Sequence, residues 1–425
     1  MLALVEKVAN KMQNPAEVKQ ACLKASAGMS LHRKVLWDDL SLSAGFPGLL
    51  LLFAQLEQLG LFEGVAHQYV LAIHQEIQGR TLNDLSLFGG VAGICFSLRE
   101  ASYEGTRYQA ILRALDDVIL RELDNVYLSP LRLHRNKQEP APSFLHDLIL
   151  GLPGIGRYLL EDLSLFGDLV EKSLICLINL CRPFVYKEKV VPGWILSAQD
   201  RLNTSSGTKP KENFNLGLAH GISGILAFFS IAWIKGVRVD GLQDMMLQIA
   251  EWIKKQKIAS EGTIQWPACA AVEEDVICRP SRDAWCYGVP GIARTLFLCG
   301  KALENKALIQ FSSRAFIQVF QRSREEWDLP GPTICHGIAG LLHITESMER
   351  SLGCKELLLP IEKLRKQLVD SYNPDALFGF RDLQLNEAGQ LVEVDSATLL
   401  EGAAGILLVL LNRNSSWHLP FLVNT

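Results

Sequence analysis

The chain has 425 residues, 48% of them hydrophobic, and a net charge of −4 in which 42 Lys and Arg nearly balance 46 Asp and Glu. This length allows two or three ordinary domains, and the hydrophobic content is ample for a core. No basic block stands out, which argues against a nucleic acid partner because phosphate binding needs clustered Lys and Arg.

The N-terminal segment, Met-Leu-Ala-Leu-Val-Glu-Lys, brings charged residues too early for the apolar part of a secretory signal. The longest apolar stretch, residues 222–234, is too short to span a bilayer. Ten cysteines are scattered along the chain without a paired framework. We therefore expect a cytoplasmic protein whose cysteines are free thiols or metal ligands.

A phrase of two glycines three residues apart, followed by an apolar run, occurs seven times. The spacing between successive copies ranges from 45 residues (Gly45 to Gly90) to 70 residues (Gly151 to Gly221), which is typical of a repeat protein. The runs are apolar almost all round, so each predicts a helix buried on every side. These predicted inner helices cover residues 49–56, 94–98, 155–160, 225–229, 292–297, 341–344 and 406–411.

Charged amphipathic stretches lie between the runs and predict outer helices with one wet face. Examples are residues 65–77, 107–123, 243–256 and 357–369. Each repeat is therefore interpreted as an outer helix, a glycine-rich turn and an inner helix.

Seven such hairpins either stack into an open solenoid or close into a ring. A solenoid needs polar capping repeats, and the last copy, residues 401–411, is as apolar as the others. We therefore predict an all-α fold, an α/α toroid of seven inner and seven outer helices, in a single domain spanning residues 1–425. Residues 187–213 depart from the repeat and are interpreted as a small insertion with short strands over one mouth of the ring.

Polar residues with metal-binding side chains stand directly before two of the glycine phrases. Cys286 lies two residues before Gly288, and Cys335 and His336 lie two and one residues before Gly337. Equivalent positions in a ring of repeats share one end of the ring, so these side chains are expected to meet. Two cysteines and a histidine leave a fourth position open, as in catalytic zinc sites. Without the repeat argument, buried free cysteines are the alternative.

Four further residues are candidates for catalysis. His220 directly precedes the fourth phrase. Histidine is the side chain most often used as a general acid or base, and the alternative for His220 is a hydrogen bond to a helix end. Asp147, four residues before the third phrase, either orients His220 or caps the following helix. Arg282 and Tyr287 lie six and one residues before the fifth phrase. Arg282 either steadies an anionic partner such as Asp147 or lies on the surface.

Three segments resemble the signature of the lanthionine synthetase C family, the lanthipeptide cyclases. They are Leu-Ala-His-Gly at 218–221, Asp-Ala-Trp-Cys-Tyr-Gly at 283–288 and Ile-Cys-His-Gly at 334–337. The resemblance covers nearly the whole chain, because all seven glycine phrases occur in order. It implies an α/α toroid with one zinc ion at one mouth. It also implies zinc ligands and catalytic residues at the positions already singled out: Cys286, Cys335 and His336 for zinc, and Asp147, His220, Arg282 and Tyr287 for catalysis.

The implied reaction is thioether ring formation in a dehydrated precursor peptide. A peptide cysteine takes the open zinc position, loses its proton and attacks the β-carbon of a dehydroalanine or dehydrobutyrine. His220 then protonates the enolate. Asp147 and Arg282 set the position and charge of His220, and Tyr287 lines the site. The resemblance further implies that the insertion takes part in peptide handling. It implies a leader on the precursor, a dehydratase and a transporter as partners, and peripheral membrane attachment through them.

Two alternative functions stay open. An enzyme of the same fold would join free glutathione to dehydroamino acids. The thiol donor distinguishes it from a cyclase, which uses a cysteine of the peptide itself. A non-catalytic scaffold would use zinc structurally or not at all, and replacing His220 would cost it no turnover. A glycosidase is disfavoured, because it needs a pair of carboxylates at the mouth and only Asp147 and Glu401 hold glycine-phrase positions.

Overall fold

A computed structural model gives the structure of residues 1–27, 37–103, 105–200, 202, 211–260, 262–273, 278–412 and 415–424. The chain divides into two compact units, which we call the first unit (Met1–Asp117 and Asp328–Trp417) and the second unit (Val118–Trp327 and His418–Thr425). Among these described residues, no helix is both long and apolar enough to cross a membrane. The single-domain organisation of residues 1–425 stays a prediction.

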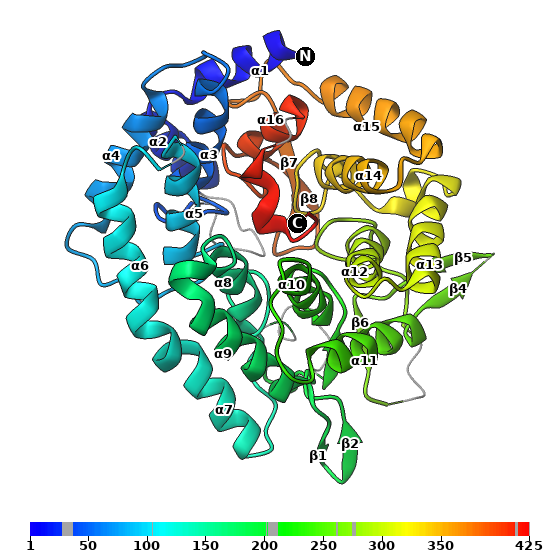
Figure 1. Ribbon diagram of the computed structural model, residues 1–425. Helices are drawn as coiled ribbons and strands as arrows, with labels where there is room; N and C mark the ends of the chain where they lie inside the picture. The colour runs from blue at the N-terminus through cyan, green and yellow to red at the C-terminus, as the bar shows by residue number, and fades with distance from the viewer. Residues whose placement is uncertain are drawn as a thin grey trace. The chain divides into compact units, whose positions relative to one another are not determined.

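The described part of the first unit contains four inner helices that begin at glycine phrases: α3 (Phe46–Glu57), α5 (Val91–Ala101), α14 (Ile338–Leu352) and α16 (Ala403–Leu411). Helix α16 contacts both α14 and α3, and α3 contacts α5, so the four lie side by side (Figure 1). In α16 every residue from Ala403 to Leu410 is buried. This burial on all sides is why its sequence is apolar at every position.

Amphipathic helices cover the inner helices of the first unit. In α4 (Val65–Ile77) the residues Val65, Tyr69 and Ile73 recur every four positions and are buried, which makes one apolar stripe. Helices α4 and α15 pack on α3 and α14, and α1 packs on α16. The outer elements of this unit are α1 (Leu2–Ala9), α2 (Pro15–Ser26), α4, α15 (Leu358–Asp370) and the start of α6 (Gln109–Leu123).

The second unit repeats the arrangement with three inner helices: α8 (Leu152–Leu159), α10 (Ile222–Ile234) and α12 (Val289–Ala302). Helix α10 contacts both α8 and α12. Outer helices pair with them, α9 with α8, α11 with α10 and α13 with α12. The outer helices of this unit include α7 (Ser129–Asn136), α9 (Leu163–Cys181), α11 (Leu242–Lys255), α13 (Lys306–Ile317) and the end of α6.

Four antiparallel two-stranded sheets complete the described structure: β1 (Phe184–Tyr186) with β2 (Lys189–Val191), β3 (Asn213–Asn215) with β6 (Cys269–Ala271), β4 (Ile258–Ser260) with β5 (Thr263–Gln265), and β7 (Arg381–Leu385) with β8 (Leu391–Asp395). Short strands are therefore present at the predicted insertion, but its hairpin begins before residue 187, and β3 pairs with a distant segment. Residues 201 and 203–210 of the insertion lie outside the described residues. The hairpin β7–β8 is an addition that the sequence analysis did not predict.

The paired glycines are required mainly because backbones approach each other closely. A Cβ on Gly221 would lie 2.3 Å from the carbonyl oxygen of Asn215. Six of the seven leading glycines have an extended backbone, so space rather than left-handed conformation excludes a side chain there. Gly288 is the exception, because its φ is 91° and a Cβ would also lie 1.8 Å from the carbonyl oxygen of Arg282.

Candidate active site and metal centre

The segments that precede α8, α10 and α12 lie side by side in the second unit. The N–H of Leu148 donates to the carbonyl oxygen of Ala219 (3.0 Å). The N–H of Ala219 in turn donates to the carbonyl oxygen of Cys286 (3.3 Å). These bonds bring Asp147, His220 and Cys286 to the same end of three neighbouring inner helices. The repeat geometry thus gathers residues that are far apart in the sequence.

Asp147 holds His220 through a short hydrogen bond. The imidazole Nδ1 lies 2.8 Å from the carboxylate Oδ2; the Asp147 side chain is fully buried, and that of His220 is 15% exposed. The other carboxylate oxygen accepts the N–H groups of Leu150 (2.7 Å) and Gly151 (3.1 Å). Asp147 therefore both orients His220 and closes the turn before α8. With Nδ1–H donated to Asp147, Nε2 is left to exchange a proton with a substrate.

Tyr287 lies beside His220, with 6.5 Å between the ring centroids. The side-chain amide of Asn215 donates to the Tyr287 hydroxyl (3.0 Å), and the amide oxygen of Asn215 accepts the N–H of Gly217 (3.0 Å). Asn215 ends strand β3, six residues before Gly221. The sequence pattern missed it because it does not adjoin a glycine phrase. We call Asp147, His220, Asn215 and Tyr287 the histidine cluster.

The C-terminal residues of the chain hold the segment that carries Cys286. The indole N–H of Trp285 donates to the carbonyl oxygen of Phe421 (3.0 Å), and both rings are buried. The Arg294 Nε on α12 donates to the carbonyl oxygen of Val423 (2.6 Å). Cys286 itself is 6% exposed, so its thiol is positioned by packing on several sides.

Arg282 is half-buried at the start of the same segment. The contact with Asp147 that the sequence suggested for Arg282 stays a prediction. The catalytic role of Arg282 stays a prediction as well. The neighbouring Asp283 is fully buried and pairs with Arg322 at 2.6 Å, which gives it a structural role within the second unit.

In the first unit, Cys335 and His336 lie on the turn that leads into α14. The N–H of Cys335 donates to the carbonyl oxygen of Leu400 (3.0 Å), which sets it beside the segment before α16. Ligand atoms of Cys335, His336 and Glu401 all lie within 4.8 Å of one another. Zinc binds sulfur, nitrogen and oxygen ligands of these kinds, so the donor set fits this ion. Two of the three predicted ligands are thus together, while Cys286 belongs to the second unit.

The imidazole of His336 lies between two carboxylates. Its Nε2 is 3.5 Å from Asp382 Oδ2, and its Nδ1 is 4.0 Å from Glu401 Oε1. Burial alone would lower the pKa of His336, but hydrogen bonds to Asp382 and Cys335 outweigh burial and raise the pKa to about 11. Asp382 lies on β7, outside the glycine repeats, so the repeat pattern could not reveal it.

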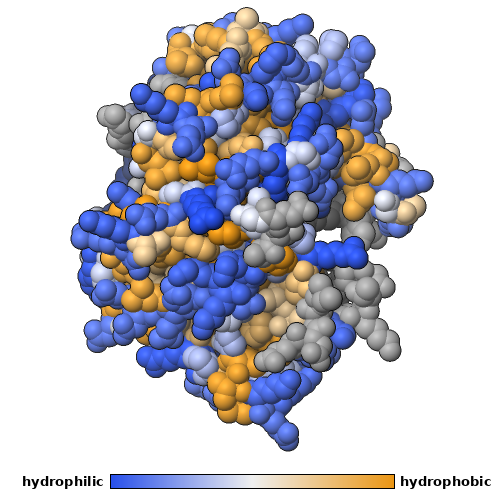
Figure 2. Space-filling model, turned by 90° about the vertical axis from the view of Figure 1, so that its right-hand side faces the viewer, coloured by the Kyte–Doolittle hydropathy of each residue, from blue (hydrophilic) through white to orange (hydrophobic). Residues whose placement is uncertain are grey.

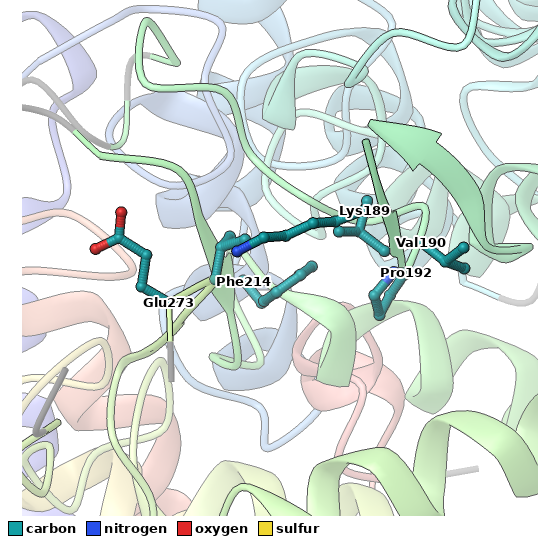
Figure 3. A pocket seen from close by; sticks show the side chains of 7 residues that line it. Lys189, Val190, Pro192, Phe214 and Glu273 are labelled. Atoms are coloured by element: carbon teal, nitrogen blue, oxygen red, sulfur yellow. The ribbon is translucent and has the colours of Figure 1, made fainter. Parts of the chain in front are cut away.

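A separate hollow lies beside the β1–β2 hairpin of the second unit (Figure 3). Its volume is about 710 Å³. Lys189 extends toward the side on which Glu273 lies, so both signs of charge stand beside apolar groups. None of the predicted catalytic or metal-binding residues, all of which are described, lines it. The lining consists of Lys189, Val190, Val191, Pro192, Phe214, Val272 and Glu273.

The chain belongs to the lanthionine synthetase C-like family. The sequence profile of this family, described as "Lanthionine synthetase C-like protein", matches residues 36–422. The family resemblance drawn from the three short motifs is thereby confirmed.

Two known proteins give the relationship more detail. The nisin biosynthesis protein NisC of Lactococcus lactis subsp. lactis is 26% identical over 388 residues, which cover 88% of this chain and 85% of NisC. The solved structure of nisin cyclase matches with a TM-score of 0.75 and 23% identity, over 96% of this chain and 95% of that chain. Nisin cyclase is an α/α toroid, and the likeness confirms the predicted fold class.

Proposed function

We propose that this protein is a zinc-dependent lanthipeptide cyclase, which closes lanthionine or methyllanthionine rings in a dehydrated precursor peptide. The observation that carries the proposal is the cluster of ligand atoms from Cys335 and His336, in the Cys-His-Gly motif before α14, and from Glu401, in the segment before α16. Kinship with a nisin biosynthesis protein supports the substrate class.

The proposed zinc ligands are Cys286, Cys335 and His336, with one ion per chain. Cys335 and His336 are supported by their place in the donor cluster. Cys286 is supported by the repeat pattern and by the Trp-Cys-Tyr-Gly motif that contains it. Zinc bound by these residues would stabilise the thiolate form of a peptide cysteine at its open position.

His220 is the proposed acid of the reaction. Addition of a thiolate to the β-carbon of a dehydroamino acid leaves an enolate, which takes up one proton at its α-carbon. Asp147 supports this role because it holds the Nδ1 side of the ring and leaves Nε2 for the substrate. Tyr287 lines the site beside the ring, and Arg282 is proposed to contribute positive charge near the developing enolate.

The precursor peptide is proposed to bind through the insertion at residues 187–213. The β1–β2 hairpin, at the lower end of Figure 1, exposes Val185 by 60% and Val190 by 75%, and Figure 2 shows hydrophobic side chains among hydrophilic ones at this end. The adjoining hollow offers a cation and an anion beside apolar groups. We further propose a dehydratase and a transporter as partners in the cytoplasm, with peripheral membrane attachment through them.

The proposal is tested by zinc content and ring formation in wild type and Cys335→Ala. We expect about one zinc ion per wild-type chain and little in the variant, because a catalytic site with two protein ligands binds zinc poorly. Thiol addition leaves the peptide mass unchanged, so rings are counted as thiols that no longer react with an alkylating reagent. A wild-type chain without zinc, or one that binds zinc and consumes no peptide thiols, would contradict the proposal.

His220→Ala distinguishes the alternative functions. We expect this variant to keep its zinc and lose ring formation, whereas a scaffold would show no turnover in either form. Supplying glutathione together with the dehydrated peptide tests the other alternative. Glutathione adducts formed in place of rings would favour the glutathione-adding enzyme.

A further inference from the structure

Asp382 is a buried carboxylate whose two oxygens are both held in place. The residue is only 2% exposed. Its Oδ1 accepts a hydrogen bond from the Thr333 hydroxyl (3.0 Å), and its Oδ2 accepts one from the Gln384 amide (3.1 Å). Oδ2 is also the atom that lies 3.5 Å from His336 Nε2. The carboxylate is therefore anchored independently of the imidazole that it faces.

The opposite nitrogen of His336 faces a different group. Nδ1 lies 4.0 Å from Oε1 of Glu401, and the other oxygen of Glu401 accepts from the same Gln384 amide nitrogen (3.1 Å). Glu401 belongs to the cluster of metal-binding atoms with Cys335, whereas Asp382 does not. Nε2 thus points to a fixed buried carboxylate, and Nδ1 points to the other potential ligands.

We propose that Asp382 is the positioning residue for the metal ligand His336: it accepts a hydrogen bond from Nε2–H and thereby directs Nδ1 at the metal. A metal-bound histidine commonly donates its second N–H to a carboxylate, which fixes the tautomer and raises the basicity of the ligating nitrogen. Gln384 completes the arrangement, because its amide joins Asp382 to Glu401. The inference rests on the proposed function only for the identity of the ion and for His336 as its ligand.

Asp382→Asn tests the proposal through metal affinity. The variant keeps the size of the side chain but removes the charge that favours Nε2–H. We expect zinc affinity, measured by competition with a chromophoric chelator, to fall about 10- to 100-fold. The matched control is Asp116→Asn, which neutralises another buried, ion-paired carboxylate of the first unit and should leave the affinity unchanged. Equal affinity in Asp382→Asn and wild type would overturn the proposal.

A second measurement needs no substitution of Asp382. In ¹⁵N NMR spectra of the zinc-loaded wild type, we expect His336 to show a protonated Nε2 and a metal-bound Nδ1, with the resonances assigned by comparison with His336→Gln. The reverse arrangement would overturn the proposal even if Asp382→Asn misfolded. Both measurements are made without peptide, so a chain that binds zinc this way and closes no rings would refute the proposed function and leave this inference standing.

Discussion

Replacing Asp147 with Asn separates the two contacts that this buried carboxylate makes. The amide oxygen of Asn can still accept the N–H groups of Leu150 and Gly151, at 2.7 and 3.1 Å in the present structure, so the turn before α8 is kept. The amide NH₂ group would instead face His220 Nδ1, now 2.8 Å from a carboxylate oxygen. It would then donate to Nδ1 and force the proton onto Nε2, the opposite tautomer.

The size of the effect follows from the bond that is lost. A hydrogen bond to a charged group contributes about 1.5–3 kcal/mol, and each 1.4 kcal/mol is tenfold in rate or binding. We therefore expect the rate of ring formation by Asp147→Asn to fall roughly 10- to 100-fold, as measured by loss of alkylatable peptide thiols, with little change in melting temperature.

Asp147→Ala is the control, because it removes the turn contacts as well. It removes the acceptor of the Leu150 N–H, whereas the N–H of Gly151 keeps a bond to the backbone carbonyl oxygen of residue 147 (3.0 Å). A backbone donor that stays buried and unpaired costs about 1–3 kcal/mol, so the melting temperature of Asp147→Ala should fall below that of Asp147→Asn. A rate for Asp147→Asn within about twofold of wild type would refute the orienting role, since the lost bond would then contribute well below the expected energy. Equal melting temperatures for the two variants would refute the turn-closing role.

Gly288→Ala should lower the melting temperature far more than Gly236→Ala. Both glycines have a positive φ (91° and 89°). Of these two positions, however, only Gly288 would bring a Cβ against the backbone, 1.8 Å from the carbonyl oxygen of Arg282. Equal shifts would contradict this packing explanation. At pH 8, iodoacetamide should modify the partly exposed Cys354 before the buried Cys22. Burial raises the pKa of Cys22 to about 11, so that about one Cys22 side chain in a thousand is a thiolate at this pH. Peptide mapping that shows the reverse order of modification would exclude this reasoning. Removing zinc with a chelator should abolish ring formation, and Zn²⁺ alone should restore it. Ring formation that persists in metal-free protein would rule out a zinc-activated thiol.

The inner helices were predictable because burial on every side leaves a direct mark on the sequence. In α10, for example, every residue from Ile222 to Ala232 is buried, and the helix begins directly after Gly221. The same register predicted that Asp147 and His220 would lie at one end of neighbouring helices. The register left their contact open, and the structure places His220 Nδ1 2.8 Å from Asp147 Oδ2.

Other parts of the candidate site carry no such mark. Asp382 lies 46 residues after His336 (382 − 336), on a hairpin that belongs to no glycine repeat. Asn215 reaches Tyr287 from strand β3, which pairs with a segment more than 50 residues away. The spacing of residues along the sequence could not reveal either of these contacts.

By itself the sequence determined the repeated buried helices and the shared position of the polar residues before them. It did so because complete burial and close backbone approach restrict the residue type at every repeat. Only the tertiary structure decided which partner each polar side chain takes: Asp147 serves both His220 and the turn before α8, and Asp382 faces His336 from an added hairpin. A hydrogen bond requires two atoms about 3 Å apart, and separation along the chain does not specify such a distance.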